Sequence, residues 1–161
     1  MPRSEILPFS HARMSYMPEN SSQTFVRGAV LVNNAGFLEE DTSDPTDIVG
    51  IAAEDGHNDT TAGTHQLAYY PITSGSLWTI NIDDSGDLGN GALVDSDFNT
   101  RYGLAVSSGV WYVDKADTSA TLVLVRRAVD HRAQIAANAA TIRTQARVVV
   151  EFLNTALHGD A

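Results

Sequence analysis

Short apolar runs follow one another along the chain from residue 24 to residue 129, separated by polar segments rich in Gly, Asn, Asp and Pro. The runs are rich in β-branched and aromatic residues, which favours strands, and the polar segments carry turn signals. The runs lie at residues 24–32, 37–38, 48–53, 66–72, 77–82, 110–114 and 121–129. Several short strands spaced by turns predict a mainly β protein with a barrel or sandwich-like domain.

The same pattern predicts finer features of these strands. Gly50 interrupts the apolar run at residues 48–53, which indicates a bulge or a close approach of a neighbouring backbone. The runs at residues 110–114 and 121–129 are predicted to pair as a hairpin across residues 115–120. Large aromatic side chains within strands are expected to fill a core or a subunit interface. Those in the predicted strands are Trp78, Trp111 and Tyr112.

Residues 1–23 are predicted to form an extended N-terminal arm, and residues 24–161 the β-rich domain. Pro2, Pro8 and Pro18 each remove a backbone donor and bias the preceding residue toward extended geometry. Apolar side chains lie between the prolines without clear periodicity: Ile6, Leu7, Phe9, Met14, Tyr16 and Met17. One interpretation is an arm that becomes ordered against a neighbouring molecule. The alternative is a segment that packs on its own domain.

The C-terminal part of the chain allows two interpretations. Residues 131–145 have Ala and Gln at helix-favouring density, whereas residues 147–153 (RVVVEFL) are β-branched and predict a closing strand. We favour a short helix or an irregular excursion followed by that strand. A continuous helix over residues 133–157 is the competing prediction.

The charge distribution narrows the classes of partner. The chain has 161 residues, no Cys and a net charge of −10, and residues 28–100 contain 13 Asp and Glu but no Lys or Arg. Such a balance repels phosphate backbones, so nucleic acid is not an expected partner. The apolar runs are too short to span a bilayer, and the first 20 residues lack the apolar core of a secretory signal. The acidic middle and the mildly basic ends indicate either electrostatic complementarity between copies or with a partner, or simply a solvated acidic surface.

Candidate chemistry is sparse. The densest polar cluster is residues 54–59 (EDGHND) followed by His65, but its spacing fits no zinc-binding motif, and its composition is typical of a loop. The loop at residues 83–91 lacks the Gly and Glu that a calcium-binding EF-hand loop requires. No nucleophile elbow, dinucleotide fingerprint or phosphate loop occurs. We therefore predict no catalytic residues, no metal and no cofactor. A small β-barrel hydrolase using His57, His65 or Asp114 is the least favoured alternative.

The order of the predicted strands resembles that of the decoration, or cement, proteins of tailed-phage heads. The pieces that carry the resemblance are residues 22–25 (SQTF), 28–32 (GAVLV), 35–40 (AGFLEE), 44–52 (DPTDIVGIA), 54–58 (EDGHN), 109–114 (GVWYVD) and 147–153 (RVVVEFL). In that family a strand after an N-terminal arm leads through an acidic loop into a "GIA"-type strand. Residues 131–145 depart from the family pattern because they are longer and more helical than a plain turn.

The resemblance implies a compact β-barrel-like fold, called a β-tulip, with an extended N-terminal arm. It also implies a homo-oligomer, commonly a trimer, that binds the major capsid protein on the outer surface of the virion after synthesis in the bacterial cytoplasm. The arm residues Ile6, Leu7, Phe9, Met14, Tyr16 and Met17 are then the expected capsid contacts. The main rival from the same structural class is a phage tail or baseplate component, or a receptor-binding module.

Overall fold

The computed structural model describes residues 6–8, 13–42, 44–83, 93–129, 147–153 and 157. These residues are mainly β, as the sequence predicts, and they form two sheets. The strands are β1 (Leu7–Pro8), β2 (Ser15–Pro18), β3 (Val30–Asn34), β4 (Phe37–Glu40), β5 (Ile48–Ala52), β6 (Gln66–Pro71), β7 (Leu77–Asp83), β8 (Arg101–Ser107), β9 (Val110–Asp114), β10 (Val123–Ala128) and β11 (Arg147–Phe152). A 3-10 turn, η1 (Asp95–Asp97), precedes β8. No helix among the described residues has the length and apolar character needed to cross a membrane.

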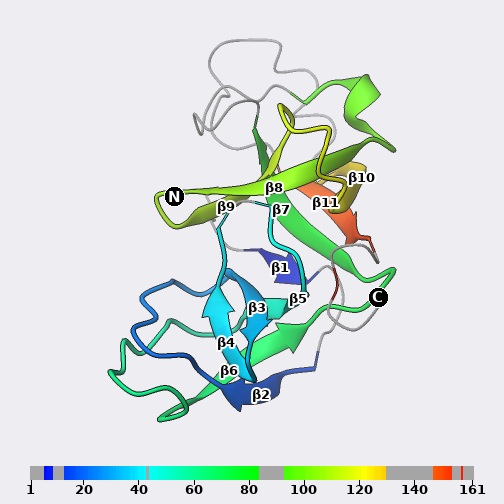
Figure 1. The fold of residues 1–161 in the computed structure, drawn as a ribbon. Coiled ribbons are helices and arrows are strands. Elements are labelled where there is room, and N and C mark those ends of the chain that lie inside the picture. Colours follow the sequence, from blue (N-terminus) through cyan, green and yellow to red (C-terminus); the bar gives the residue numbers. More distant parts are fainter. Residues whose placement is uncertain are drawn as a thin grey trace.

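The strands of sheet A have the order β1-β7-β11-β10-β8-β9 and occupy the upper half of Figure 1. Strand β7 also pairs in parallel with β9, from Asn81 opposite Tyr112 to Asp83 opposite Asp114. The pairings of β7, β11, β10, β8 and β9 therefore form a closed circuit, and β1 pairs with the first part of β7.

The strands of sheet B have the order β2-β6-β5-β3-β4 and occupy the lower half of Figure 1. A parallel bridge joins Glu19, just after β2, to Leu38 of β4, and the backbone N–H of Asn20 donates to the Leu38 carbonyl over 2.8 Å. This sheet also returns on itself, because the bridge connects its two outer strands.

One hydrophobic cluster runs through both sheets. Trp78 and Trp111 are buried in this cluster, as predicted for large aromatics within strands, and the Trp78 ring meets Phe152 edge to face. Tyr112 is also buried but lies outside the cluster. Because side chains alternate along a strand, Tyr112 faces away from the core that its neighbour Trp111 enters.

The predicted irregularity at Gly50 is confirmed. Leu31 pairs with Gly50 while the next residue of β3 pairs with Ile48, so one residue of β5 is bulged. A Cβ atom at Gly50 would lie 2.4 Å from the Tyr70 carbonyl oxygen. The glycine therefore allows the close backbone approach that the sequence indicated.

Several sequence predictions are corrected by the structure. Strands β9 and β10 do not form a hairpin; β9 pairs with β8 and β7, and β10 pairs with β8 and β11. The predicted strand at residues 24–32 begins only at Val30, as β3, and residues 24–29 form no strand. Arg147–Phe152 is a strand, as favoured above, which contradicts a continuous helix over residues 133–157. Residues 131–145 lie outside the described residues.

Candidate functional site

The two sheets are joined by polar contacts from the segment that links β4 to β5, which rises to sheet A and returns in Figure 1. The indole N–H of Trp111 on β9 donates to Glu40 at the end of β4, with 2.8 Å between the two heavy atoms. Asp44 pairs with Leu104 of β8 like a residue of a strand. Its N–H donates to the Leu104 carbonyl over 2.7 Å, and its carboxylate accepts from the Leu104 N–H over 3.1 Å. We call Glu40, Asp44, Leu104 and Trp111 the junction.

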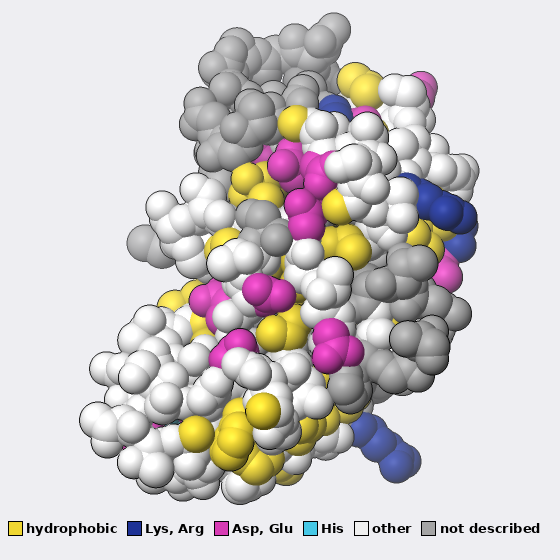
Figure 2. Space-filling model, in the orientation of Figure 1, with side chains coloured by type: hydrophobic (Ala, Val, Ile, Leu, Met, Phe, Trp, Pro, Cys, Tyr) yellow, Lys and Arg dark blue, Asp and Glu magenta, His cyan; other side chains and the backbone are white. Residues whose placement is uncertain are grey.

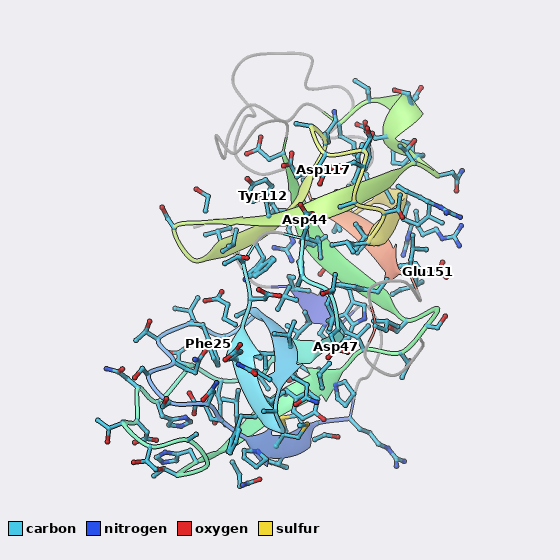
Figure 3. All side chains as sticks on the ribbon, viewed as in Figure 1. Phe25, Asp44, Asp47, Tyr112, Asp117 and Glu151 are labelled. Carbon is cyan, nitrogen blue, oxygen red and sulfur yellow. The ribbon has the colours of Figure 1, made fainter. Side chains whose placement is uncertain are left out.

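A pair of carboxyl groups lies at the junction above Gly103 of β8. Asp44 and Asp117 share a side-chain hydrogen bond, and both are labelled next to β8 in Figure 3. A Cβ atom at Gly103 would lie 2.4 Å from an Asp44 oxygen and 2.7 Å from an Asp117 oxygen. The absent side chain therefore makes room for both acids. Two carboxylates can share such a hydrogen bond only when one of them carries a proton.

The two acids of the pair have opposite pKa shifts. Burial, followed by the hydrogen bond to Asp117, raises the pKa of Asp44. Hydrogen bonds from Ser119 and Ala120 lower the pKa of Asp117 to about 2. Of the two acids, Asp44 is therefore the one that takes up a proton first as the pH falls, and Asp117 is the one that stays ionised.

Asp44→Asn is expected to preserve the contacts of the junction at every pH, since an amide can accept a hydrogen bond from the Leu104 N–H and donate one to Asp117. The pKa of Asp44 is higher in the folded chain than in the unfolded chain. The protonated Asp44 side chain therefore stabilises the fold fully at a pH below its unfolded-state pKa, and this stabilisation is lost as the pH rises through its folded-state pKa. The variant should therefore gain stability relative to wild type from about pH 4 upward, by about 1 kcal/mol in total.

Urea denaturation between pH 3.5 and 8 measures this difference. Asp95→Asn, a change at an exposed residue of η1, is the matched control and should show no such trend. A difference between wild type and Asp44→Asn that is independent of pH would contradict the shared proton.

A row of polar side chains crosses the outer face of sheet A. The register places Arg147 beside Asn81, and Asn81 beside Tyr112. The Arg147 guanidinium donates to the Asn81 side-chain oxygen over 3.2 Å, whereas the buried Asn81 amide nitrogen has no hydrogen-bond partner. Burial, followed by the charges of Asp114 and Asp83, raises the pKa of Tyr112, so its hydroxyl is neutral. This row is a polar network and has no nucleophile beside a base.

The predicted polar cluster at residues 54–65 is folded around a carboxylate from outside it. Glu19 is 2% exposed; its carboxylate accepts from the His57 N–H over 2.8 Å and contacts the His57 ring Nδ1 over 2.6 Å. The His65 ring stacks on the His57 ring with 4.1 Å between centroids, and its Nδ1 contacts Asp59. The hydrogen bond with Asp59 raises the pKa of His65.

The stacked rings of His57 and His65, together with the Glu19 carboxylate, hold the loop at residues 54–65 against the end of β2. Both Nδ1 atoms are engaged by carboxylates, and the parallel rings do not point at a common centre. Among the residues that the structure describes, no group of three His, Cys, Asp or Glu is placed to hold a metal ion. Asp114, the third residue of the hydrolase alternative, lies at the end of β9 in the other sheet. The structure therefore brings together two of the three residues on which that alternative depends.

The six predicted capsid contacts are distributed between core and surface. Ile6 is 1% exposed within the hydrophobic core, and Met17 packs against the core. Leu7 lies in β1, and Phe9 lies outside the described residues. Met14 and Tyr16 are 53% and 62% exposed. Figure 2 shows apolar side chains gathered at the lower end of the molecule, over β2.

The described part of the N-terminal segment packs on its own chain. Strand β1 pairs with β7 in sheet A, and β2 pairs with β6 in sheet B. Over residues 6–8 and 13–23 the structure therefore shows the alternative in which the segment packs on its own domain. Met14 and Tyr16 remain accessible on the strand that this segment contributes.

Sequence reasoning missed Glu19 and Asp44 as the residues that organise these contacts. Glu19 acts on a loop 38 positions further along the chain, and Asp44 acts on a strand 60 positions further along. No local motif marks either residue. The only signal at Asp44 is the following Pro45, which indicates a turn.

Comparison of the chain with protein-family models, with curated proteins and with solved structures finds no match.

Proposed function

We propose that this chain is a non-enzymatic decoration protein of a tailed-phage head, which binds the outer surface of the major capsid protein lattice and stabilises the shell. The observation that carries the proposal is the exposed apolar surface at β2, formed by Met14 just before the strand and Tyr16 within it. Large apolar side chains exposed together on a strand are typical of protein-binding surfaces. We call these two residues the β2 surface.

The proposed contact is made by side chains rather than by strand addition. Ser15–Pro18 pairs with β6 along one edge, and its other edge approaches β4, to which the parallel bridge at Glu19 joins it.

The proposed fold of the decoration protein is a barrel-like body of the β-tulip type. The closed circuit of sheet A supports a barrel-like body, because a sheet that returns on itself leaves few free edges. The N-terminal segment acts as the contact element while β1 and β2 are docked on the body. This arrangement lowers the entropy cost of binding compared with a free tail, because the contact strand is already ordered.

Many weak contacts are sufficient for this role. Copies of a decoration protein that oligomerise, as a trimer in our proposal, each engage neighbouring capsid subunits, and linked contacts raise the overall affinity. A protein that binds the assembled shell in preference to free subunits shifts the equilibrium toward the shell by mass action.

Met14→Ser together with Tyr16→Ser is expected to weaken binding to capsids by about 10- to 100-fold, since each change removes an apolar side chain from the contact. Cosedimentation with expanded, undecorated heads of the phage that encodes the chain, followed by imaging, measures binding. The control is Val94→Ser with Val129→Ser, which removes two similarly exposed apolar side chains, one just before η1 and one just after β10.

Unchanged binding by the β2 variant would contradict the proposed contact surface, and absence of binding by the wild-type protein would contradict the function. Binding of the wild-type protein to host cells instead of heads would favour the receptor-binding alternative. Point changes are preferable to deletion of the first 21 residues, because that deletion removes β1, β2 and the buried Glu19 together.

A further inference from the structure

Three arginines form a basic strip on sheet A. Arg101 begins β8 and pairs with Leu124 of β10, while Arg126 and Arg127 lie further along β10. All three side chains are exposed, and Arg126 also pairs with Glu151 of β11. Figure 2 shows basic side chains at the side of the molecule beside β10. This strip carries a concentrated positive charge in a protein whose net charge is −10.

An acidic strip runs along a different face. Asp44, Asp47 and Asp117 are labelled along it in Figure 3, from β8 down to the start of β5. Figure 2 shows acidic side chains along this face of the molecule, where basic side chains are rare. Asp41 from the same linking segment and Asp114 from the end of β9 complete the strip as we define it. All but the exposed Asp47 are partly buried.

We propose that the basic strip of one copy binds the acidic strip of a second copy, head to tail. The inference rests on the proposed function, for which it names the contact between subunits. The two strips lie on different faces, so each copy binds one neighbour through its basic strip and another neighbour through its acidic strip. Such heterologous contacts generate a closed ring when the rotation between copies closes, and a trimer is one such ring.

Charge complementarity favours a second copy as the occupant of the basic strip. Each copy carries both strips, so association places arginines of one copy opposite carboxylates of the next. The net negative charge does not prevent this contact, because salt screens charges beyond about 8 Å under physiological conditions. Nucleic acid is disfavoured as an occupant because the rest of the surface repels phosphates.

Arg101→Glu with Arg127→Glu is expected to raise the Kd of self-association by about 100-fold, because it opposes like charges across the contact. These positions leave the Arg126–Glu151 ion pair in place. Sedimentation velocity over a concentration series measures the oligomeric state and the Kd of self-association. Arg13→Glu with Arg27→Glu is the matched control, since it changes the net charge equally at exposed positions of the sheet B half. The control should assemble like wild type.

Changing the charge of the acidic strip provides a second test. Asp41→Lys with Asp47→Asn should weaken assembly alone and should restore it when added to the Arg101→Glu and Arg127→Glu chain. Asn is chosen at Asp47 because that residue has φ +70°, which Asn adopts readily. Restoration would identify the two strips as partners, since all four changes then lie in one chain.

The outcomes separate this inference from the proposed function. A wild-type protein that stays monomeric at every concentration, or a basic-strip variant that assembles normally, overturns the contact between copies while capsid binding can persist. A basic-strip variant that assembles normally but loses capsid binding assigns the strip to the capsid and also overturns the inference. A wild-type oligomer that binds no heads overturns the function and leaves the contact between copies intact.

Discussion

Gly50→Ala is expected to lower the free energy of unfolding by about 3 kcal/mol, at the upper end of the usual range for overpacking. Gly50 lies in β5, between β3 and β6, and its Cβ would lie 2.4 Å from the Tyr70 carbonyl oxygen and 2.6 Å from the Tyr69 ring. The carbonyl belongs to a paired strand, so a side-chain rotation cannot relieve the clash. The expected response is a shift of β6 away from β5.

Chemical denaturation measures this loss, and Gly109→Ala is the control. Gly109 has φ +75°, and nothing lies within 4 Å of its Cβ position. That substitution should cost only the left-handed backbone strain, about 1 kcal/mol. Equal losses at the two positions would show that backbone conformation, rather than the approach of β6, determines the effect at Gly50.

Trp111→Ala is expected to cost about 3–5 kcal/mol, because it empties a large site in the core. Trp111 is 1% exposed and lies where the two sheets meet. The change also removes the indole N–H that donates to Glu40 across the junction. Both sheets should therefore lose stability together, and thermal unfolding followed by near- and far-ultraviolet circular dichroism should show one transition at a lower temperature.

Trp111→Phe separates the hydrogen bond from the packing. Burial raises the pKa of Glu40, whereas the hydrogen bond from Trp111 lowers it. Without the indole N–H the pKa should rise further, so the variant should lose more stability at neutral pH than at pH 4, by about 1–2 kcal/mol.

Trp78→Phe is the control for the indole hydrogen bond, because the Trp78 N–H donates to the neutral hydroxyl of Ser76. Its effect should not depend on pH. A Trp111→Phe effect that is equally independent of pH would contradict the role of the indole in holding the Glu40 carboxylate.

The junction connects these stability predictions to the proposed function. The β2 surface belongs to sheet B, whereas the basic strip belongs to sheet A. In the proposed role, the chain binds the capsid through sheet B and another copy through sheet A. Any mechanical force between these two contacts would then pass through the junction residues Glu40, Asp44 and Trp111. Weakening the junction should therefore reduce shell stabilisation even where each separate contact is preserved.

The candidate contact surface was only partly predictable from the sequence. The apolar side chains of residues 6–17 predict contact, but the pattern does not distinguish a contact with the chain's own core from a contact with a partner. The structure separates them, since Ile6 is buried whereas Met14 and Tyr16 are exposed. The difference follows from which face of β1 or β2 meets the body, and this depends on strands far along the chain.

The local pattern of the sequence determined the β class, most of the strands and the special geometry at Gly50. These features depend on neighbouring residues, because β-branched runs, turn residues and a glycine within a strand act over a few positions. Strand β8 was missed because its sequence, RYGLAVS, contains a glycine that weakens the strand signal.

Only the tertiary structure decided which strands are neighbours and which acids meet. Strand β9 pairs with β8 and β7 rather than with the predicted β10, which closes the circuit of sheet A. Glu19 reaches His57, and Asp44 reaches Asp117, across long stretches of chain. Such pairings depend on how the whole core closes, so they leave no periodic signal in the sequence.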